Sequence, residues 1–165
     1  MIPQIKKILF ATDLSKNSAY AFFYAVHMAK RDEAKIVILH AVEPLPPMLI
    51  TFGDFSHQVA KDRWEETAKK FKERIQDISA KVDTRMGTSS VDLVCDILIR
   101  LGHPVEEILK AVEEEGCDVI VLGSHGKGFL KQTFLGSVSS SVLLRARKPV
   151  FVVPLPSEDT NIDSI

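Results

Sequence analysis

Glycine and serine residues in the last third of the chain have the types and the spacing needed to hold a phosphate group. The segment GSHGKGFLKQTFLGSVSSS, residues 123–141, contains half of the eight glycines of the chain. Glycine reaches positive φ and lets a ligand approach main-chain N–H groups closely. A helix that begins near Gly136 would offer unpaired N–H groups and partial positive charge, to which serine hydroxyls add donors. The segment therefore predicts a site for a phosphate-bearing ligand.

Single features of this segment also have purely structural interpretations. Ser137 is a good helix cap, Gly126 and Gly128 are common loop residues, and Lys127 and Lys131 are typical solvated charges. Taken one at a time, these interpretations outweigh a functional one. Because all of these residues follow one apolar run, VIVLG, their joint occurrence favours a binding site.

Other phosphate-binding and catalytic motifs do not fit these residues. A Walker loop needs Lys and then Ser or Thr after its last glycine, whereas Phe129 and Leu130 follow Gly128. The dinucleotide fingerprint needs a glycine where Lys131 stands. The RNA-binding KH loop joins two helices, whereas this loop follows a predicted strand, and no serine has the flanking glycines of a nucleophile elbow.

The elements that must position this segment alternate between strand and helix. Short apolar runs rich in β-branched residues predict strands, and apolar residues at helical spacing predict helices between them. The expected strands are 7–11, 34–42, 89–102, 117–123 and 150–153, and the expected helices are 19–30, 54–82, 104–115 and 138–148.

The ends of several expected helices follow known preferences. Pro104 suits the first position of a helix, and Gly116 suits the position just past its end. We expect the last helix to run up to Pro149, with cations that complement its dipole in the final turn: Arg145, Arg147 and Lys148.

The longest expected helix follows a proline-rich segment. Residues 54–82 contain no glycine or proline, and apolar residues recur there in one stripe: Trp64, Ala68, Phe71, Ile75, Ile78 and Val82. Three prolines in EPLPPMLITFGDF exclude regular structure over the first half of that segment, which predicts a long loop over residues 44–54. Covering a ligand and acting as a spacer both stay open for this loop.

The alternation of strands and helices predicts an α/β fold in a single domain. Parallel neighbours need crossover connections, so we expect an open five-stranded parallel sheet with helices on both faces. Ligands of such sheets bind beyond the carboxyl ends of the strands, where the topology changes direction. Gly123 lies at the carboxyl end of the fourth expected strand, which places the phosphate segment at that edge.

Composition sets limits on the partners of the chain. At 165 residues the chain fits one domain, which we assign to residues 1–155, followed by a polar, flexible tail over residues 156–165. A formal charge of -1 gives no reason to expect binding to nucleic acid or to an anionic membrane. The apolar run near the N-terminus is too short for a signal peptide or a membrane span.

The two cysteines fit a cytoplasmic location. Cys95 and Cys117 each lie within an apolar stretch, which predicts buried, reduced thiols, with a disulfide as the weaker alternative.

The spacing of the phosphate segment resembles the ATP-binding branch of the universal stress protein family. Gly123-Ser-His-Gly126, nine further residues and then Gly136-Ser137 match its G-x2-G-x9-G-S motif without a gap. Other stretches resemble the family in the same order along the chain: KKILFATDLS, VILHAVEP, GHPVEEIL and KPVFVVP. The resemblance extends from Ile5 to Pro154.

This resemblance implies a fold and a set of ligand contacts. It implies a Rossmann-like sheet in the order 3-2-1-4-5, with a crevice between the ends of strands one and four. Asp13, preceded by Ala11 and Thr12, matches the position that contacts adenosine, although a cap of the first helix explains Asp13 equally well. Ala41 matches the position whose backbone meets the adenine ring.

The resemblance also assigns the phosphate end of the site. It implies that Gly123 and Gly126 line the ribose and phosphate path. It places the terminal phosphates at the start of the last helix, on Gly136, Ser137, Val138 and Ser139. For His125, inside the motif, a ligand contact and simple exposure are equally open. The other histidines have no metal-ligand spacing and fit structural roles.

The function implied by the resemblance is a regulatory one. We expect an ATP-binding protein that responds to stress or energy state, with Mg²⁺ or Mn²⁺ held mainly by the phosphates. No general base stands near the phosphate positions, so we expect slow hydrolysis or none. A dimeric interaction scaffold without nucleotide is one alternative. A slow ATPase or adenylyl-transferring enzyme is a weaker one, because ATDLSKNS has neither a Ser-Gly-Gly loop nor a His-x-x-His pair.

The resemblance further implies a homodimer. The strand Val150 to Val153 is expected at an edge of the sheet, where unpaired backbone groups invite a second copy of the chain. Adenine nucleotide and a second subunit are the expected partners, and a further protein partner stays open. We also expect Gly126→Val to abolish nucleotide binding without loss of the fold.

Overall fold

The computed structural model describes residues 2–44, 55–125 and 135–154. The expectations for the proline-rich loop, for Gly126 with its neighbouring lysines, and for the tail after residue 155 lie outside these residues. Five strands form one parallel sheet in the order β3-β2-β1-β4-β5, as predicted. They are β1 (Lys7–Ala11), β2 (Lys35–Val42), β3 (Val94–Leu101), β4 (Val119–Gly123) and β5 (Val150–Val153).

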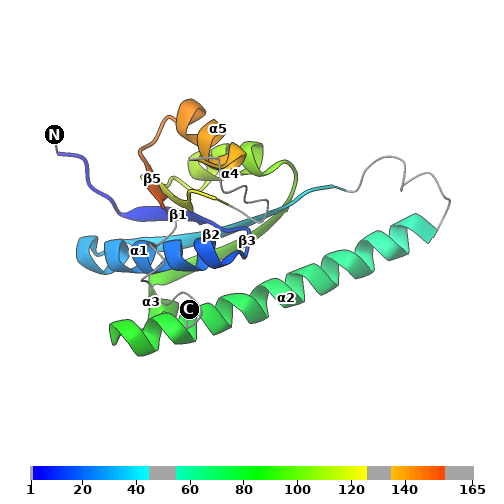
Figure 1. Ribbon diagram of the computed structural model, residues 1–165, viewed down its shortest axis with the longest axis horizontal. Coiled ribbons are helices and arrows are strands. Elements are labelled where there is room, and N and C mark those ends of the chain that lie inside the picture. Colours follow the sequence, from blue (N-terminus) through cyan, green and yellow to red (C-terminus); the bar gives the residue numbers. More distant parts are fainter. Residues whose placement is uncertain (1, 45–54, 126–134, 155–165) are drawn as a thin grey trace.

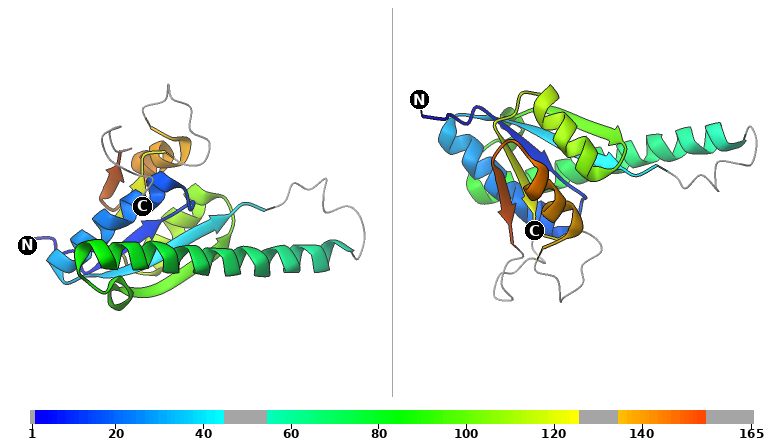
Figure 2. Two further views of the ribbon diagram at one scale, coloured as in Figure 1. Left: turned by 60° about the horizontal axis from the view of Figure 1, so that its bottom comes forward. Right: turned by 90° about the horizontal axis from the view of Figure 1, so that it is seen from above.

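Helices cover both faces of this sheet (Figure 1). They are α1 (Lys16–Asp32), α2 (Phe55–Met86), the single turn α3 (Ser90–Leu93), α4 (Pro104–Glu114) and α5 (Ser137–Arg145). Figure 2 shows α4 and α5 on one face, with α1 and α2 on the other. Because β-strand side chains alternate between faces, Ile8 and Phe10 of β1 pack with α1 and α2, whereas Leu9 packs with α4 and α5.

The long helix α2 packs along only part of its length. Phe71, Ile75, Ile78 and Val82 are buried against the α1 side of the sheet, as the predicted stripe requires. Trp64 and Ala68, one to two turns earlier on the same stripe, are half-buried. Figure 1 shows why, since the N-terminal part of α2 extends past the end of the sheet.

Two predicted boundaries are wrong for local reasons. The third expected strand begins at Val94 and not at Ser89, because the turn of α3 occupies Ser90–Leu93. The last helix ends at Arg145, where Ala146 takes an extended conformation with φ of -66° and ψ of 141°. Arg147 and Lys148 therefore lie beyond the helix, and Pro149 does not end it.

The two thiols differ, which corrects the expectation that both are buried. Cys117 is fully buried, and burial raises the pKa of its thiol to about 12. Cys95 lies on β3, at the edge of the sheet, and is exposed. The two thiols are free, with no disulfide between them.

None of the described helices is both long enough and apolar enough to cross a membrane.

Candidate functional site

A cavity of about 800 Å³ opens at the carboxyl edge of the sheet, between the ends of β1, β2 and β4. Its wall brings together every predicted site residue that the structure describes. These residues are Ala11, Thr12, Asp13, Ala41, Gly123, His125, Gly136, Ser137, Val138 and Ser139. Gly126 lies outside the described residues.

Side chains shape the turn from β1 into α1. Asp13 Oδ1 accepts a hydrogen bond from Ser15 N at 2.9 Å, and Thr12 Oγ1 accepts one from Leu14 N at 3.0 Å. Together these bonds hold Leu14 at a φ of 65°, which a residue with a side chain adopts only when its surroundings impose it. Ser15 is the N-cap of α1 and accepts from Ser18 N at 3.2 Å. Asp13 is therefore not the cap of this helix, and its structural contribution is to close the turn that precedes the cap.

The end of β2 is fixed by a buried histidine. His40 stacks on Phe71 of α2, with ring centroids 5.1 Å apart, and its Nδ1 lies 2.8 Å from the carbonyl oxygen of Thr12. These contacts agree with a structural role for His40 and join β1, β2 and α2 around one corner of the cavity, although His40 also lines the cavity, which was not predicted. The neighbouring Ala41 points to the opposite face of the sheet.

Gly123 ends β4, and the reason for a glycine there differs from the expected one. Its φ is not positive, since Gly87 and Gly116 alone among the described glycines have positive φ. A Cβ at this position would lie 2.7 Å from Asn17 Oδ1. Glycine is required because the side chain of Asn17 fills this space.

Main-chain bonds hold β4 and β5 to the start of α5. Ser124 N donates to the carbonyl oxygen of Val153, and Gly136 N donates to the carbonyl oxygen of Ser124, both at 2.7 Å. The hydroxyl of Ser139 donates to the carbonyl oxygen of Gly123 at 2.7 Å. Ser139 therefore anchors α5 to β4 and has no hydroxyl proton left to give to a phosphate.

The start of α5 is the part of the cavity best suited to an anion. Gly136 is the N-cap of α5, and no described side chain caps this helix. Ser137 is the first helical residue, so it is not the helix cap that the structural interpretation proposed. The side chain of Ser137 is exposed, whereas that of Ser139 is buried. Helix N-termini carry unpaired N–H groups and partial positive charge, both of which bind anions.

His125 lies between the two halves of the cavity. Its backbone N donates to Asn17 Oδ1 at 2.9 Å, and its Nδ1 lies 2.8 Å from the hydroxyl of Ser124. The ring is half-buried and lines the cavity. The backbone of His125 is thus tied to α1, and its ring is held by the neighbouring Ser124 hydroxyl.

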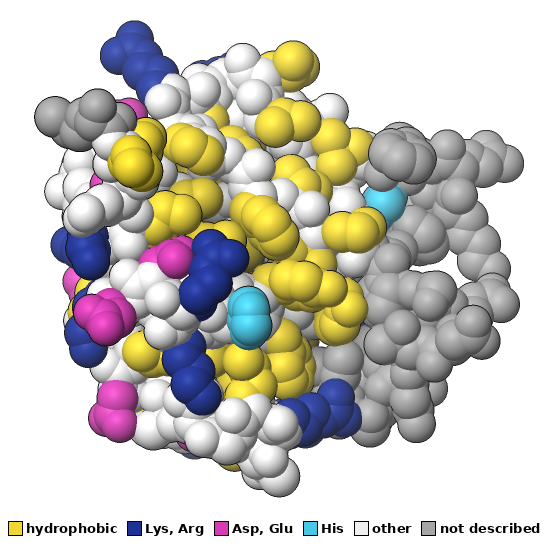
Figure 3. All heavy atoms as spheres, turned by 90° about the vertical axis from the view of Figure 1, so that its left-hand side faces the viewer, with side chains coloured by type: hydrophobic (Ala, Val, Ile, Leu, Met, Phe, Trp, Pro, Cys, Tyr) yellow, Lys and Arg dark blue, Asp and Glu magenta, His cyan; other side chains and the backbone are white. Residues whose placement is uncertain are grey.

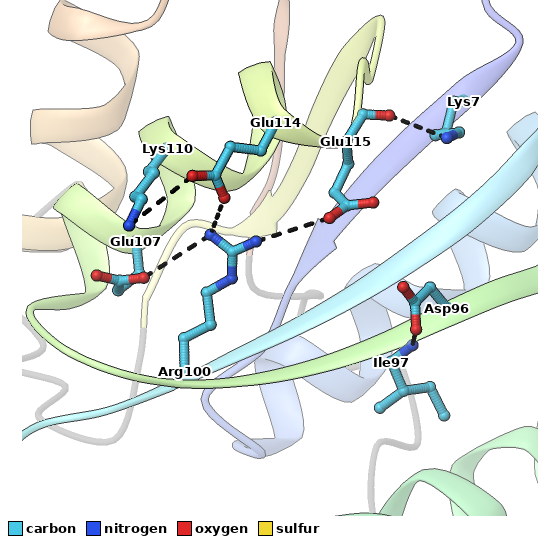
Figure 4. Close-up of polar contacts among 8 residues, drawn as sticks. All are labelled: Lys7, Asp96, Ile97, Arg100, Glu107, Lys110, Glu114 and Glu115. Atoms are coloured by element: carbon cyan, nitrogen blue, oxygen red, sulfur yellow. Dashed lines mark hydrogen bonds and ion pairs between the residues drawn. The ribbon is translucent and has the colours of Figure 1, made fainter.

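An ion-pair cluster fixes α4, whose Pro104 and Ile108 form another wall of the cavity. Figure 4 shows Arg100 reaching from β3 toward three glutamates of the α4 region. Its guanidinium nitrogens lie 2.7 Å from Glu114, 3.7 Å from Glu115 and 3.9 Å from Glu107. Exposed ion pairs contribute little singly, but three that share one partly buried arginine restrain the helix relative to the sheet.

The remaining lining suggests how a ligand lies in the cavity. Leu39, Val42, Ile108 and Leu122 supply apolar surface, which suits a flat ring. Polar main chain at the start of α5 suits a charged group at the other end. A second depression, lined by Trp64 and neighbouring side chains, lies on α2 alone and contains none of the predicted site residues.

Sequence reasoning missed the remaining apolar residues of the cavity wall, His40 and four further polar residues of this region. Ser18, Glu43 and Thr67 line the cavity, and Asn17 lies directly beneath Gly123 and His125. The polar residues of the first turn of α1, directly after a strand end, were a usable signal for Asn17 and Ser18. Thr67 comes near the cavity only through the packing of α2, which no local pattern reveals.

Comparison with known proteins agrees with this geometry. The family model described as "Universal stress protein family" matches residues 4–154. Universal stress protein MJ0577 of Methanocaldococcus jannaschii is 30% identical over 165 residues, covering 90% of this chain and 94% of that protein. A solved structure of MJ0577 has a TM-score of 0.73 at 29% identity, and the match covers 94% of this chain and 100% of that one.

Two more distant structures share the fold. A universal stress protein in complex with cAMP has a TM-score of 0.60 at 21% identity, covering 93% of this chain and 100% of that one. A universal stress protein from Archaeoglobus fulgidus in complex with dAMP has a TM-score of 0.54 at 19% identity, covering 93% and 99%.

Proposed function

The chain belongs to the universal stress protein family, and on this premise we propose that it is a regulatory protein that binds ATP in the strand-end cavity. The observation that carries the proposal is one continuous cavity joining Asp13 and Ala41 to the start of α5 at Gly136. Two proteins of this fold were solved with the adenine nucleotides cAMP and dAMP, which supports the same ligand class here.

The adenosine lies at the β1 and β2 ends in this proposal. Adenine packs on the apolar wall of Leu39 and Ile108 and meets the backbone of Ala41, as the family resemblance implies. Asp13 faces the ribose, where a carboxylate accepts hydrogen bonds from hydroxyl groups. The hydrogen bond from Ser15 N holds this carboxylate in place before the ligand arrives.

The phosphates lie at the β4–α5 side in this proposal. N–H groups at the start of α5, on Ser137, Val138 and Ser139, bind the terminal phosphates. Mg²⁺ would take its ligands from phosphate oxygens and water. Among the described residues no three His, Cys, Asp or Glu side chains gather into a metal site.

The same geometry supports binding without rapid hydrolysis. The carboxylates of the cavity wall, Asp13 and Glu43, belong to the β1 and β2 ends, whereas the terminal phosphate is proposed at α5. General-base catalysis needs a base within hydrogen-bond reach of the attacking water. We therefore expect at most slow turnover of ATP.

Thermal unfolding with and without Mg-ATP tests the proposal. ATP at about 100 times its dissociation constant is expected to add roughly 2.7 kcal/mol to the free energy of unfolding. Acid extraction of the purified protein is expected to release adenine nucleotide. Absence of any shift at millimolar ATP would instead favour the alternative of a scaffold without nucleotide.

We further propose a homodimer through β5, which lies at an edge of the sheet with its outer backbone groups unpaired by any described strand. Tyr24 of α1 and Phe151 of β5 are 39% and 40% exposed, and their ring centroids lie 6.0 Å apart. Figure 3 shows hydrophobic side chains gathered on the side of the molecule that carries β5 and α1. Sedimentation at micromolar concentration is expected to give the dimer mass, and a monomer mass would refute the proposal.

A further inference from the structure

Asn17, in the first turn of α1, is a buried amide tied to a distant part of the chain. Its Oδ1 accepts the hydrogen bond from His125 N at 2.9 Å, across 108 positions of sequence. Asn17 is only 4% exposed. This one side chain therefore joins the first turn of α1 to the segment that leaves β4 beside the cavity.

The backbone of β4 is adapted to this amide. A Cβ at position 123 would lie 2.7 Å from Asn17 Oδ1 and 3.0 Å from its Cγ, closer than side-chain packing permits. Gly123 leaves that space to the amide, and both Gly123 and His125 line the cavity. Asn17 therefore sets the position of two residues of the cavity wall without lining the cavity itself.

The nitrogen of the Asn17 amide is not explained by the stability of the fold alone. Asn17 Nδ2 is buried and has no hydrogen-bond partner within the described part of the chain. A buried donor without an acceptor destabilises the fold. An aspartate would keep the acceptor for His125 N without an unpaired donor, and it would suit the first turn of a helix. What separates asparagine from aspartate here is the negative charge.

We propose that Asn17 is a positioning residue for polyphosphate, selected because it tethers the end of β4 while adding no negative charge there. It holds Gly123 and the backbone of His125 where the phosphates of the nucleotide pass. A carboxylate in its place would make the same tether but would repel those phosphates. This inference rests on the proposed function, since the phosphates supply the reason for neutrality.

The test compares affinities for adenosine, AMP, ADP and ATP in the Asn17→Asp variant by isothermal titration calorimetry. Repulsion between the introduced carboxylate and the phosphates is expected to weaken ATP binding about tenfold or more, with AMP and ADP losing less. Adenosine, which has no phosphate, is expected to keep its affinity within about twofold. His27→Asp adds the same charge on the exposed side of α1 and is expected to leave all four affinities unchanged.

A second variant, Asn17→Ser, tests the tether even if the aspartate variant does not fold. Asn17→Ser stays polar but is too short to reach His125 N, so ATP is again expected to lose more affinity than adenosine. Equal losses for the two ligands, or no loss of either, would show a purely structural side chain and overturn the proposal. If the unmodified chain bound neither ligand, the proposed function itself would fail, and this inference with it.

Discussion

On the β1–α1 side of the cavity, side chains bond to the backbone of the turn, whereas on the β4–α5 side bonds between main-chain groups join β4 to β5 and to the start of α5. Asp13 and Thr12 close the first turn through their own side chains, and His40 locks the adjoining strand. Across the cavity, Ser124 and Gly136 are joined through backbone groups. In the proposed function, the first side would present a preset carboxylate to the neutral ribose, and the second would present N–H groups to the phosphates.

This difference predicts that changes on the two sides weaken binding in different ways. A change in the β1–α1 turn at Thr12 or Asp13 is expected to affect every adenosine-containing ligand alike. Asn17 lies on α1 but is bonded to His125 N after β4, so it is grouped with the β4–α5 side. A change on the β4–α5 side is expected to act in proportion to the number of phosphates. Adenosine and ATP are the two ligands that distinguish these cases.

The largest effect is expected for Gly123→Ala. Its Cβ would displace Asn17 and break the bond to His125 N, which is expected to lower the free energy of unfolding by about 1–3 kcal/mol. ATP affinity is expected to fall about a hundredfold, and adenosine affinity much less, by calorimetry. Gly102→Ala is the matched control. Its Cβ would lie 2.6 Å from Glu107 Oε1, a similarly close contact, but at a site away from the proposed phosphate path. Similar loss of ATP affinity in both variants would contradict the assignment.

A smaller effect, equal for both ligands, is expected for Asp13→Ala. Losing a charged hydrogen-bond partner of the ribose is expected to weaken adenosine and ATP alike by about ten- to a hundredfold. Asp13→Asn keeps an oxygen that accepts from Ser15 N and controls for the shape of the turn. If the alanine variant lost affinity for ATP but kept its affinity for adenosine, Asp13 would not contact the ribose as proposed.

The smallest effects separate Ser139 from Ser137. Ser139→Ala removes the hydrogen bond to the Gly123 carbonyl and is expected to lower the free energy of unfolding by about 1 kcal/mol. Ser137→Ala alters an exposed hydroxyl and is expected to leave stability unchanged while lowering ATP affinity a few-fold. Urea unfolding and calorimetry measure the two quantities, and the reverse pattern would show that Ser139 is the phosphate contact.

Most of the fold follows from local patterns in the sequence. Short apolar runs between helical stretches predict the strands, and the family resemblance supplies their order. The elements that differ depend on single residues with weak local preferences. Ala146 leaves the helix in an extended conformation without a glycine or proline to mark the place, and the single turn of α3 lies within an apolar run.

The site is predicted less completely, for a physical reason. The spacing G-x2-G-x9-G-S identifies Gly123 and Gly136 through its resemblance to the family motif. Spacing does not reveal that the Ser139 hydroxyl donates to the Gly123 carbonyl oxygen, or that Asn17 fills the space beside that glycine. Those contacts join residues far apart in sequence, and only the packing of α1 and α5 on β4 brings them together.

A crystal structure of the protein grown with Mg²⁺ and excess ATP tests the central claim most directly. The account predicts phosphate oxygens within hydrogen-bond distance of the backbone N–H groups of Ser137, Val138 and Ser139. It also predicts the ribose at Asp13 and the adenine ring at Ala41. A nucleotide whose phosphates lie away from the start of α5, or a cavity that stays empty at saturating ATP, would contradict it.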